Sequence, residues 1–278
     1  MVQLVGPTSL LIDPPYFVDT HCHFDFPPFS GAEAASLASA AQANVRQLII
    51  PAVSAAYFPR ILALAERYPP LFAALGLHPL YIAEHQEADL ATLASYLANK
   101  PEKLLAVGEM GLDLYMDEPQ FPRQLALLQA QLKLAKQHDL PVILHSRRSH
   151  DQLAAALRKA ALPCTGVVHG FAGSLAQAQA FIRLGYYIGV GGTITYERAQ
   201  KTRNVMAVLP LSALLLETDA PDMPLAGFQG QPNRPERAAQ VFAALCELRP
   251  EAPHEIATHL LENSQRLFQL PPADQSSR

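Results

Sequence analysis

The chain has 278 residues, of which 50% are hydrophobic and 17% are charged, and its formal net charge is −4 at pH 7. This composition indicates a globular protein with a large core, and no apolar stretch approaches the roughly 20 residues that a membrane-spanning helix needs. The acidic charge argues against a protein that coats long nucleic acid by bulk attraction, but it leaves room for a local basic pocket that binds one phosphate.

The cysteines and the N-terminus indicate the compartment. Cys22, Cys164 and Cys246 are widely spaced and odd in number, which argues against a disulfide framework and fits a reducing cytosol. Residues 1–11 have neither a basic start nor a small-residue cleavage site, so the sequence predicts no secretory signal. We therefore expect a cytoplasmic protein without membrane association, and no obligate protein partner is evident.

The chain begins with a proline-containing lead-in, residues 1–16, and the first predicted strand follows in Phe17-Val18-Asp19-Thr20-His21-Cys22-His23. Further apolar runs predict strands at 47–51, 71–76, 103–108, 140–144, 165–168, 186–190 and 214–218. Helices are predicted between them at about 30–45 with Ser30 as its cap, 56–67, 88–99, 121–138, 151–159, 174–184 and 199–208. Two closing helices, at about 235–248 and 253–268, precede a polar tail at 271–278.

Eight apolar strands alternating with helices are the pattern of an α/β fold, a single (β/α)8 TIM-type barrel, which we place at residues 17–270. The nearly continuous apolar character of the strands fits parallel strands covered on both faces. A doubly wound open sheet is the alternative, but ligand-type residues at five strand ends favour closure. In a barrel every βα loop opens on the C-terminal face, so residues far apart in the sequence converge there.

Six residues with metal-binding side chains stand at these strand ends. In an extended chain His21 and His23 point the same way, whereas Cys22 points opposite and is expected to pack in the core. The other four each follow an apolar run, and they are Glu109, His145, His169 and Asp219. Each alone could be an ordinary loop residue, but their shared placement favours a metal site. Four histidines and two carboxylates are about the number that two divalent ions need, with Glu109 as the natural bridge.

Five motifs in order resemble the TatD family of metal-dependent deoxyribonucleases, and within it the YjjV-like branch. They are the opening His-x-His, Gly-Glu-Met-Gly-Leu-Asp at 108–113, Val-Ile-Leu-His-Ser-Arg at 142–147, Val-His-Gly-Phe at 168–171 and Leu-Glu-Thr-Asp-Ala-Pro at 216–221. The resemblance runs from about Phe17 to Phe268 and implies a barrel of the amidohydrolase superfamily. It also implies one ion held by His21, His23, Glu109 and Asp219, and a second held by Glu109, His145 and His169. The chain departs from the family's common His-Cys-Phe-Ser-Gly by having Gly170 and Ala172 after His169.

We expect a metal-dependent hydrolase of phosphodiester bonds, in particular a deoxyribonuclease of the exonuclease type that acts on DNA ends. A hydroxide that bridges two divalent cations would attack phosphorus, and Asp219 would accept its proton. The imidazole ligands favour zinc or manganese, while the carboxylates leave magnesium open. Two other functions stay open: an amidohydrolase-type hydrolase of a small ester, amide or phosphoester, and a metal-binding protein without catalytic activity.

Four further residues are candidates for substrate contact. His78 lies at the mouth of the third strand, where a structural hydrogen bond is the competing interpretation. Arg147 lies two residues past His145 and could bind a phosphate through two N–H groups, or remain a solvated charge. Asn233 and Arg234 follow a Gly/Pro-rich loop at 223–232 that is long enough to fold over the mouth. The remaining basic cluster is expected to be a solvated helix face: Arg198, Lys201 and Arg203.

Overall fold

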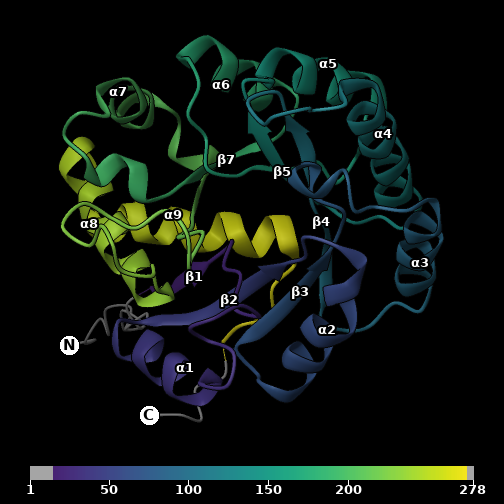
Figure 1. The fold of residues 1–278 in the computed structure, drawn as a ribbon. Coiled ribbons are helices and arrows are strands. Elements are labelled where there is room, and N and C mark those ends of the chain that lie inside the picture. The colour runs from purple at the N-terminus through teal and green to yellow at the C-terminus, as the bar shows by residue number, and fades with distance from the viewer. Residues whose placement is uncertain (1–14, 274–278) are drawn as a thin grey trace, which may run out of the picture.

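The computed structural model describes residues 15–273, so most of the lead-in, residues 1–14, and the end of the polar tail, residues 274–278, lie outside the described part. The chain forms one sheet of eight parallel strands joined in sequence order (Figure 1). The strands are β1 (Phe17–Asp19), β2 (Val45–Pro51), β3 (Leu71–Leu75), β4 (Leu104–Asp113), β5 (Val142–Arg147), β6 (Gly166–Val168), β7 (Tyr187–Val190) and β8 (Leu214–Leu216). This topology confirms the predicted (β/α)8 barrel.

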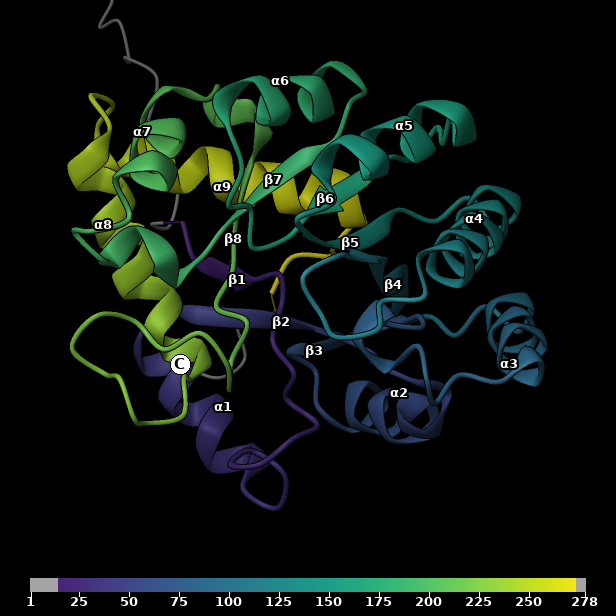
Figure 2. The same cartoon turned by 45° about the horizontal axis from the view of Figure 1, so that its top comes forward.

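The α-helices of the described residues alternate with the strands and surround the sheet (Figure 2). They are α1 (Glu33–Gln42), α2 (Phe58–Arg67), α3 (Glu87–Ala98), α4 (Phe121–Gln137), α5 (His150–Ala160), α6 (Leu175–Arg183), α7 (Gln200–Val208), α8 (Ala238–Leu248) and α9 (Pro253–Phe268). Ser174 caps α6 as predicted, because its side chain accepts the backbone N–H of Gln177. None of the helices between residues 15 and 273 combines the length and apolar character that crossing a membrane requires.

The sheet closes between β1 and β8 through hydrogen bonds at and just beyond the ends of these two short strands. The backbone N–H of Thr20 donates to the carbonyl of Leu216 at 3.0 Å, and the N–H of Asp219 donates to the carbonyl of His21 at 2.8 Å. These bonds exclude the doubly wound open sheet. They also place His21 beside Asp219, although the two residues lie at opposite ends of the barrel sequence.

The interior of the barrel is a packed apolar cluster. Each strand contributes at least one side chain to this cluster or to the partly buried residues packed against it. The strand residues buried in the cluster are Val18, Ile49, Phe72, Ala74, Ala106, Ile143, Val167 and Leu215. Leu267 and Phe268 at the end of α9 join this cluster and cover the N-terminal end of the barrel. Figure 1 shows α9 crossing the barrel end in yellow. The C-terminal face, which α9 does not cross, is the face where barrels of this type carry their functional sites.

Strands β4 and β5 extend further than predicted. β4 continues past Glu109 to Asp113, and β5 continues past His145 to Arg147, so both candidate ligands lie within paired strands. Gly111 allows the two backbones to approach, because its φ is +144° and a Cβ there would collide with the carbonyl of His145. The prediction that these strands end just before Glu109 and His145 is therefore wrong, and the predicted strand at 214–218 is likewise shorter, ending at Leu216.

The predicted helix at 30–45 is also wrong at both ends. α1 begins at Glu33 after Ala32, so Ser30 is not its cap, and it ends at Gln42. Asn44 adopts a left-handed conformation with φ +64°, which stops the helix. Val45 then starts β2 and pairs with Phe17 of β1.

Candidate metal centre

A buried carboxylate, Glu109, is the centre of a polar cluster at the C-terminal mouth of the barrel. Its Oε1 atom lies 3.0 Å from Nε2 of His21 and 3.4 Å from Nε2 of His23. Oδ1 of Asp219 approaches the same two nitrogens at 3.4 Å and 3.3 Å. The structure thus brings together the four residues of the first predicted ligand set, and His21, His23 and Asp219 could hold a metal ion.

The second oxygen of Glu109 faces a different group of histidines. Oε2 lies 2.9 Å from Nε2 of His169, 3.0 Å from Nε2 of His78 and 3.4 Å from Nδ1 of His145. The carboxylate therefore separates two sets of imidazoles, one set for each oxygen. This is the arrangement expected of a group that bridges two cations.

A second buried carboxylate, Asp113, orients His145. Oδ2 of Asp113 lies 2.7 Å from Nε2 of His145 and accepts a hydrogen bond from Nε of Arg147 at 2.9 Å. With the proton of His145 on Nε2, the lone pair is on Nδ1, the atom that faces Glu109. Asp113 is absent from the site residues predicted from the sequence, although it ends the motif at 108–113.

Glu217 has the corresponding place beside His169. Its Oε1 atom lies 3.4 Å from Nδ1 of His169 and accepts the backbone N–H of Gly170. A proton on Nδ1 leaves the Nε2 lone pair of His169 free on the Glu109 side. Glu217 too is absent from the predicted residues. The signal for it is its position two residues before Asp219, which in an extended chain is the same face.

His78 differs from the four predicted histidine ligands in which ring nitrogen carries its proton. Its Nδ1 accepts the backbone N–H of Leu80 at 3.0 Å, so in the neutral ring the proton is on Nε2, which faces Glu109. Burial lowers the pKa of His78 to about 4, which keeps the ring neutral. His78, Glu109 and His145 also form a group that could hold a metal ion. The contact with Leu80 nevertheless favours His169 over His78 as the ligand, because His78 then has no lone pair facing Glu109.

The electrostatics of the cluster favour positive charge. Burial disfavours a charged imidazole, but hydrogen bonds to Asp219 and Glu109 raise the pKa of His23 well above its usual value. Against the same effect of burial, the charges of Glu109 and Glu217 raise the pKa of His169 well above its usual value. Since protons and metal ions compete for the same ring nitrogens, this donor set fits divalent cations.

A cavity of about 620 Å³ opens over the cluster. His78 and Arg147, which the sequence proposes for substrate contact, line it, and Gly170 and Ala172 line it as well. The cavity therefore brings two of the four predicted substrate-contact residues to the candidate metal centre.

Asn233 and Arg234 do not line this cavity. Asn233 is fully buried, and its side-chain amide donates to the carbonyls of Thr218 at 2.9 Å and Asp222 at 3.0 Å. Arg234 pairs with Glu236. We therefore assign both residues to holding the 218–236 segment, and the structure does not support the predicted direct contact with substrate.

Two other predictions concern residues outside the histidine cluster. Cys22 is buried in the core cluster, as predicted. The basic start of α7 is not uniformly solvated, because Arg203 donates from Nη1 to the carbonyl of Ile194 at 2.5 Å, whereas Lys201 is exposed.

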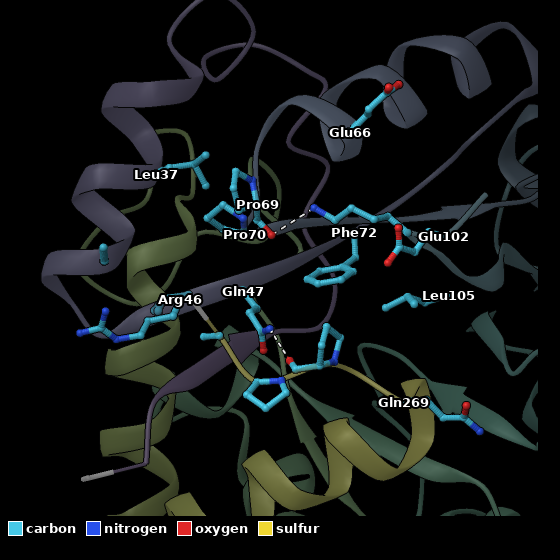
Figure 3. Close-up of a pocket in the computed structure, with 16 residues that line it drawn as sticks. Leu37, Arg46, Gln47, Glu66, Pro69, Pro70, Phe72, Glu102, Leu105 and Gln269 are labelled. Atoms are coloured by element: carbon cyan, nitrogen blue, oxygen red, sulfur yellow. Dashed lines mark hydrogen bonds between the residues drawn. The ribbon is translucent and has the colours of Figure 1, made fainter. Parts of the chain in front are cut away.

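A larger cavity, of about 760 Å³, lies at the opposite end of the barrel (Figure 3). Gln47 and Phe72, from the starts of β2 and β3, line it together with Glu66. Figure 3 shows the hydrogen bond of 2.8 Å that Gln47 donates to the carbonyl of Pro271. Among its lining residues in the described chain there is no histidine. Size alone does not locate the chemistry here, and the smaller cavity over the histidine cluster is the candidate site.

Comparison with known proteins agrees with this geometry. A family model described as "TatD related DNase" matches residues 18–269. The uncharacterised metal-dependent hydrolase YjjV of Escherichia coli (strain K12) is 65% identical over 255 residues, which are 92% of this chain and 98% of that protein. The crystal structure of YjjV covers the same shares of both chains with a TM-score of 0.91. The 3′-5′ ssDNA/RNA exonuclease TatD of Erwinia billingiae (strain Eb661) is 32% identical over 239 residues, which are 84% of this chain and 91% of that protein.

Proposed function

The chain belongs to the TatD-related DNase family of metal-dependent hydrolases, and we propose that it hydrolyses the phosphodiester bonds of DNA from strand ends. The activity named for the Erwinia relative supports this proposal. The observation that carries it is the Glu109 carboxylate, whose two oxygens face two separate sets of histidines. Such a carboxylate could bridge two divalent ions, and a pair of ions can stabilise in-line displacement at phosphorus.

The proposed ligands are the four histidines and two carboxylates predicted from the sequence. His21, His23 and Asp219 would hold one ion together with Glu109, and His145 and His169 would hold the other together with Glu109. Imidazole and carboxylate donors suit zinc or manganese, and magnesium remains open. Bound there, the ions would lower the pKa of a water towards 7 and stabilise negative charge on the phosphoryl oxygens.

Two side chains of the cluster handle protons in this proposal. Asp219 is the general base, because its Oδ1 faces the cluster and its side chain keeps 22% of its surface exposed, so water can reach it. The Nε2 N–H of His78 lies 3.0 Å from Oε2 of Glu109 in the structure and would donate instead to a phosphoryl oxygen of bound substrate, since Nδ1 of His78 is occupied by the N–H of Leu80. Glu109 keeps its charge, because the surrounding histidines outweigh burial and lower its pKa well below the usual value.

A metal-reconstitution assay tests the proposal. Protein stripped with a chelator and reloaded with Zn²⁺, Mn²⁺ or Mg²⁺ is incubated with single-stranded DNA, RNA or bis(p-nitrophenyl) phosphate, and its metal content is measured. We expect about two ions per chain and release of nucleotides from DNA ends by the reloaded protein only. A Glu109→Gln variant, which keeps the size but not the charge of the bridge, should lose both.

The alternatives give different results in the same assay. Hydrolysis of small esters or amides without cleavage of DNA would support a small-molecule hydrolase. Binding of metal without hydrolysis of any of these substrates would support a non-catalytic metal-binding protein.

A further inference from the structure

An exposed aromatic ring and two arginines gather beside the candidate site. Tyr115 follows β4 and is 56% exposed. The guanidinium carbons of Arg147 and Arg148 lie 4.7 Å and 4.5 Å from the centroid of its ring. Arg147 also lines the cavity over the histidine cluster. We call Tyr115, Arg147 and Arg148 the rim cluster.

Asp113 fixes the rim cluster relative to the candidate metal centre. Its Oδ2 atom holds Nε2 of His145 at 2.7 Å and Nε of Arg147 at 2.9 Å, and its Oδ1 accepts the backbone N–H of Tyr115 at 3.0 Å. Asp113 is fully buried, so one carboxylate anchors a candidate ligand and two residues of the rim. Arg147 uses only Nε for this bond, which leaves its two terminal nitrogens to bind another group.

The rim cluster carries positive charge that is only partly compensated. In the part of the chain that the structure describes, Asp113 is the ion-pair partner of Arg147, and Arg148 has no carboxylate within 4.0 Å. The ring of Tyr115 stabilises both guanidinium groups by cation–π contact. Two arginines held on one aromatic ring suit a nucleic-acid backbone, because guanidinium binds phosphate through paired N–H groups and flat cationic or aromatic surfaces stack on bases.

We propose that the rim cluster binds the nucleotide next to the scissile bond in a single-stranded nucleic acid. Arg147 and Arg148 bind its phosphate, and Tyr115 holds the two guanidinium groups in place. This inference rests on the proposed function. It narrows the substrate class to a chain with at least one phosphate beyond the one that reacts, because the rim cluster lies outside the histidine cluster itself.

Kinetics on two substrates and binding at several salt concentrations test the inference. The metal-loaded wild type is compared with Arg148→Ala, Tyr115→Ala and Tyr115→Phe on a single-stranded DNA pentanucleotide and on bis(p-nitrophenyl) phosphate, which has no flanking phosphate. Binding of a phosphorothioate pentanucleotide is measured between about 50 and 200 mM salt. Arg147 is not varied, because its removal would also disturb Asp113 and His145. Arg158→Ala is the control, since Arg158 is exposed in the last turn of α5.

Arg148→Ala should raise the KM for the pentanucleotide about threefold to thirtyfold, with a smaller effect on bis(p-nitrophenyl) phosphate. It should also reduce the slope of log K against log salt by about 0.7, the value for one phosphate contact on a single strand. Tyr115→Ala should also raise the KM for the pentanucleotide. Tyr115→Phe should have a KM close to that of the wild type, because the aromatic ring remains. Arg158→Ala should change neither KM nor slope.

Two results would overturn the inference. Equal losses on both substrates would show that the rim cluster acts at the reacting phosphate, and unchanged KM and slope would show that its arginines are solvated charges. Failure of the proposed function is distinguishable, because the wild type would then hydrolyse bis(p-nitrophenyl) phosphate or another small ester but not the pentanucleotide, and the inference would fail with it.

Discussion

The imidazole rings of His21 and His169 stack face to face, with centroids 3.7 Å apart and planes 4° apart. Their Nε2 atoms both face Glu109, and their Nδ1 atoms are buried without a hydrogen-bond partner among residues 15–273. The Glu217 carboxylate lies within 4.8 Å of both rings, and its Oε2 is also unpartnered in that range. The Nδ1 atoms of two imidazole rings therefore face one carboxylate, which would hold both rings in the orientation that metal binding requires.

Glu217→Gln should weaken metal binding by about tenfold to a hundredfold, because an amide is a poorer acceptor for the two imidazole N–H groups. Competition with a chelator at fixed pH measures this effect without relying on turnover. Glu247→Gln, at an exposed position of α8, is the matched control. Unchanged affinity in Glu217→Gln would mean that Glu217 serves only the backbone N–H of Gly170 and not the two rings.

Asp219→Asn should lower kcat by about a hundredfold or more while the protein remains folded. The amide can keep a ligand oxygen, but it cannot accept a proton as the carboxylate does. Steady-state kinetics at matched metal content measures the effect. Asp222→Asn changes a neighbouring carboxylate that also lines the cavity, and it should have a much smaller effect. A near-normal rate in metal-loaded Asp219→Asn would identify another group as the base.

Asn233→Ala should destabilise the protein by about 1–3 kcal/mol, because the carbonyls of Thr218 and Asp222 would lose their buried donor. Urea unfolding measures the change. Asn204→Ala, at an exposed position of α7, is the control and should have little effect. Normal stability together with a raised KM would instead support the contact with substrate that the sequence predicts for Asn233.

His150 should contribute to acid sensitivity. The ring is nearly buried, stacks on Phe171, and has Nδ1 2.6 Å from Oγ of Ser146. Burial lowers the pKa of His150, so between the folded and unfolded pKa values only the unfolded chain binds the proton. Its contribution to stability is therefore present above the unfolded value of about 6.5 and is lost as the pH falls below it.

His150→Phe, which keeps an aromatic ring but does not titrate, should narrow the gap between the urea midpoints at about pH 7.5 and about pH 5.5. The quantity compared between wild type and variant is the difference between the urea midpoints at the two pH values, because loss of the bond to Ser146 lowers both midpoints. An unchanged gap would assign the acid sensitivity to other groups, such as His78, whose pKa burial also lowers.

Much of the fold and the gathering of the candidate ligands could be predicted from the sequence. Apolar runs and helical periodicity are local signals, and they locate eight strands in their correct order. Once the strands are parallel and the barrel closes, residues after the strand ends must meet on one face. His21 and Asp219 therefore come together although almost the whole barrel separates them in the sequence. The boundaries of β4 and β5 are harder to predict from the sequence, because they depend on how the two strands pair near Gly111.

The sequence by itself determined the barrel and the types of residue that reach its mouth, because strand period and strand order are properties of the chain. Only the tertiary structure decided what each side chain does there. Leu80 directs the proton of His78 towards Glu109, and Asp113 ties Arg147 to His145. Asn233 lies in the loop predicted to reach substrate, but its side-chain amide donates its hydrogen bonds to backbone carbonyls instead. The physical reason is the same in each case: the role of a polar group depends on its hydrogen-bond partners, and these come from segments that are distant in the sequence or from a backbone turn that side-chain patterns do not reveal.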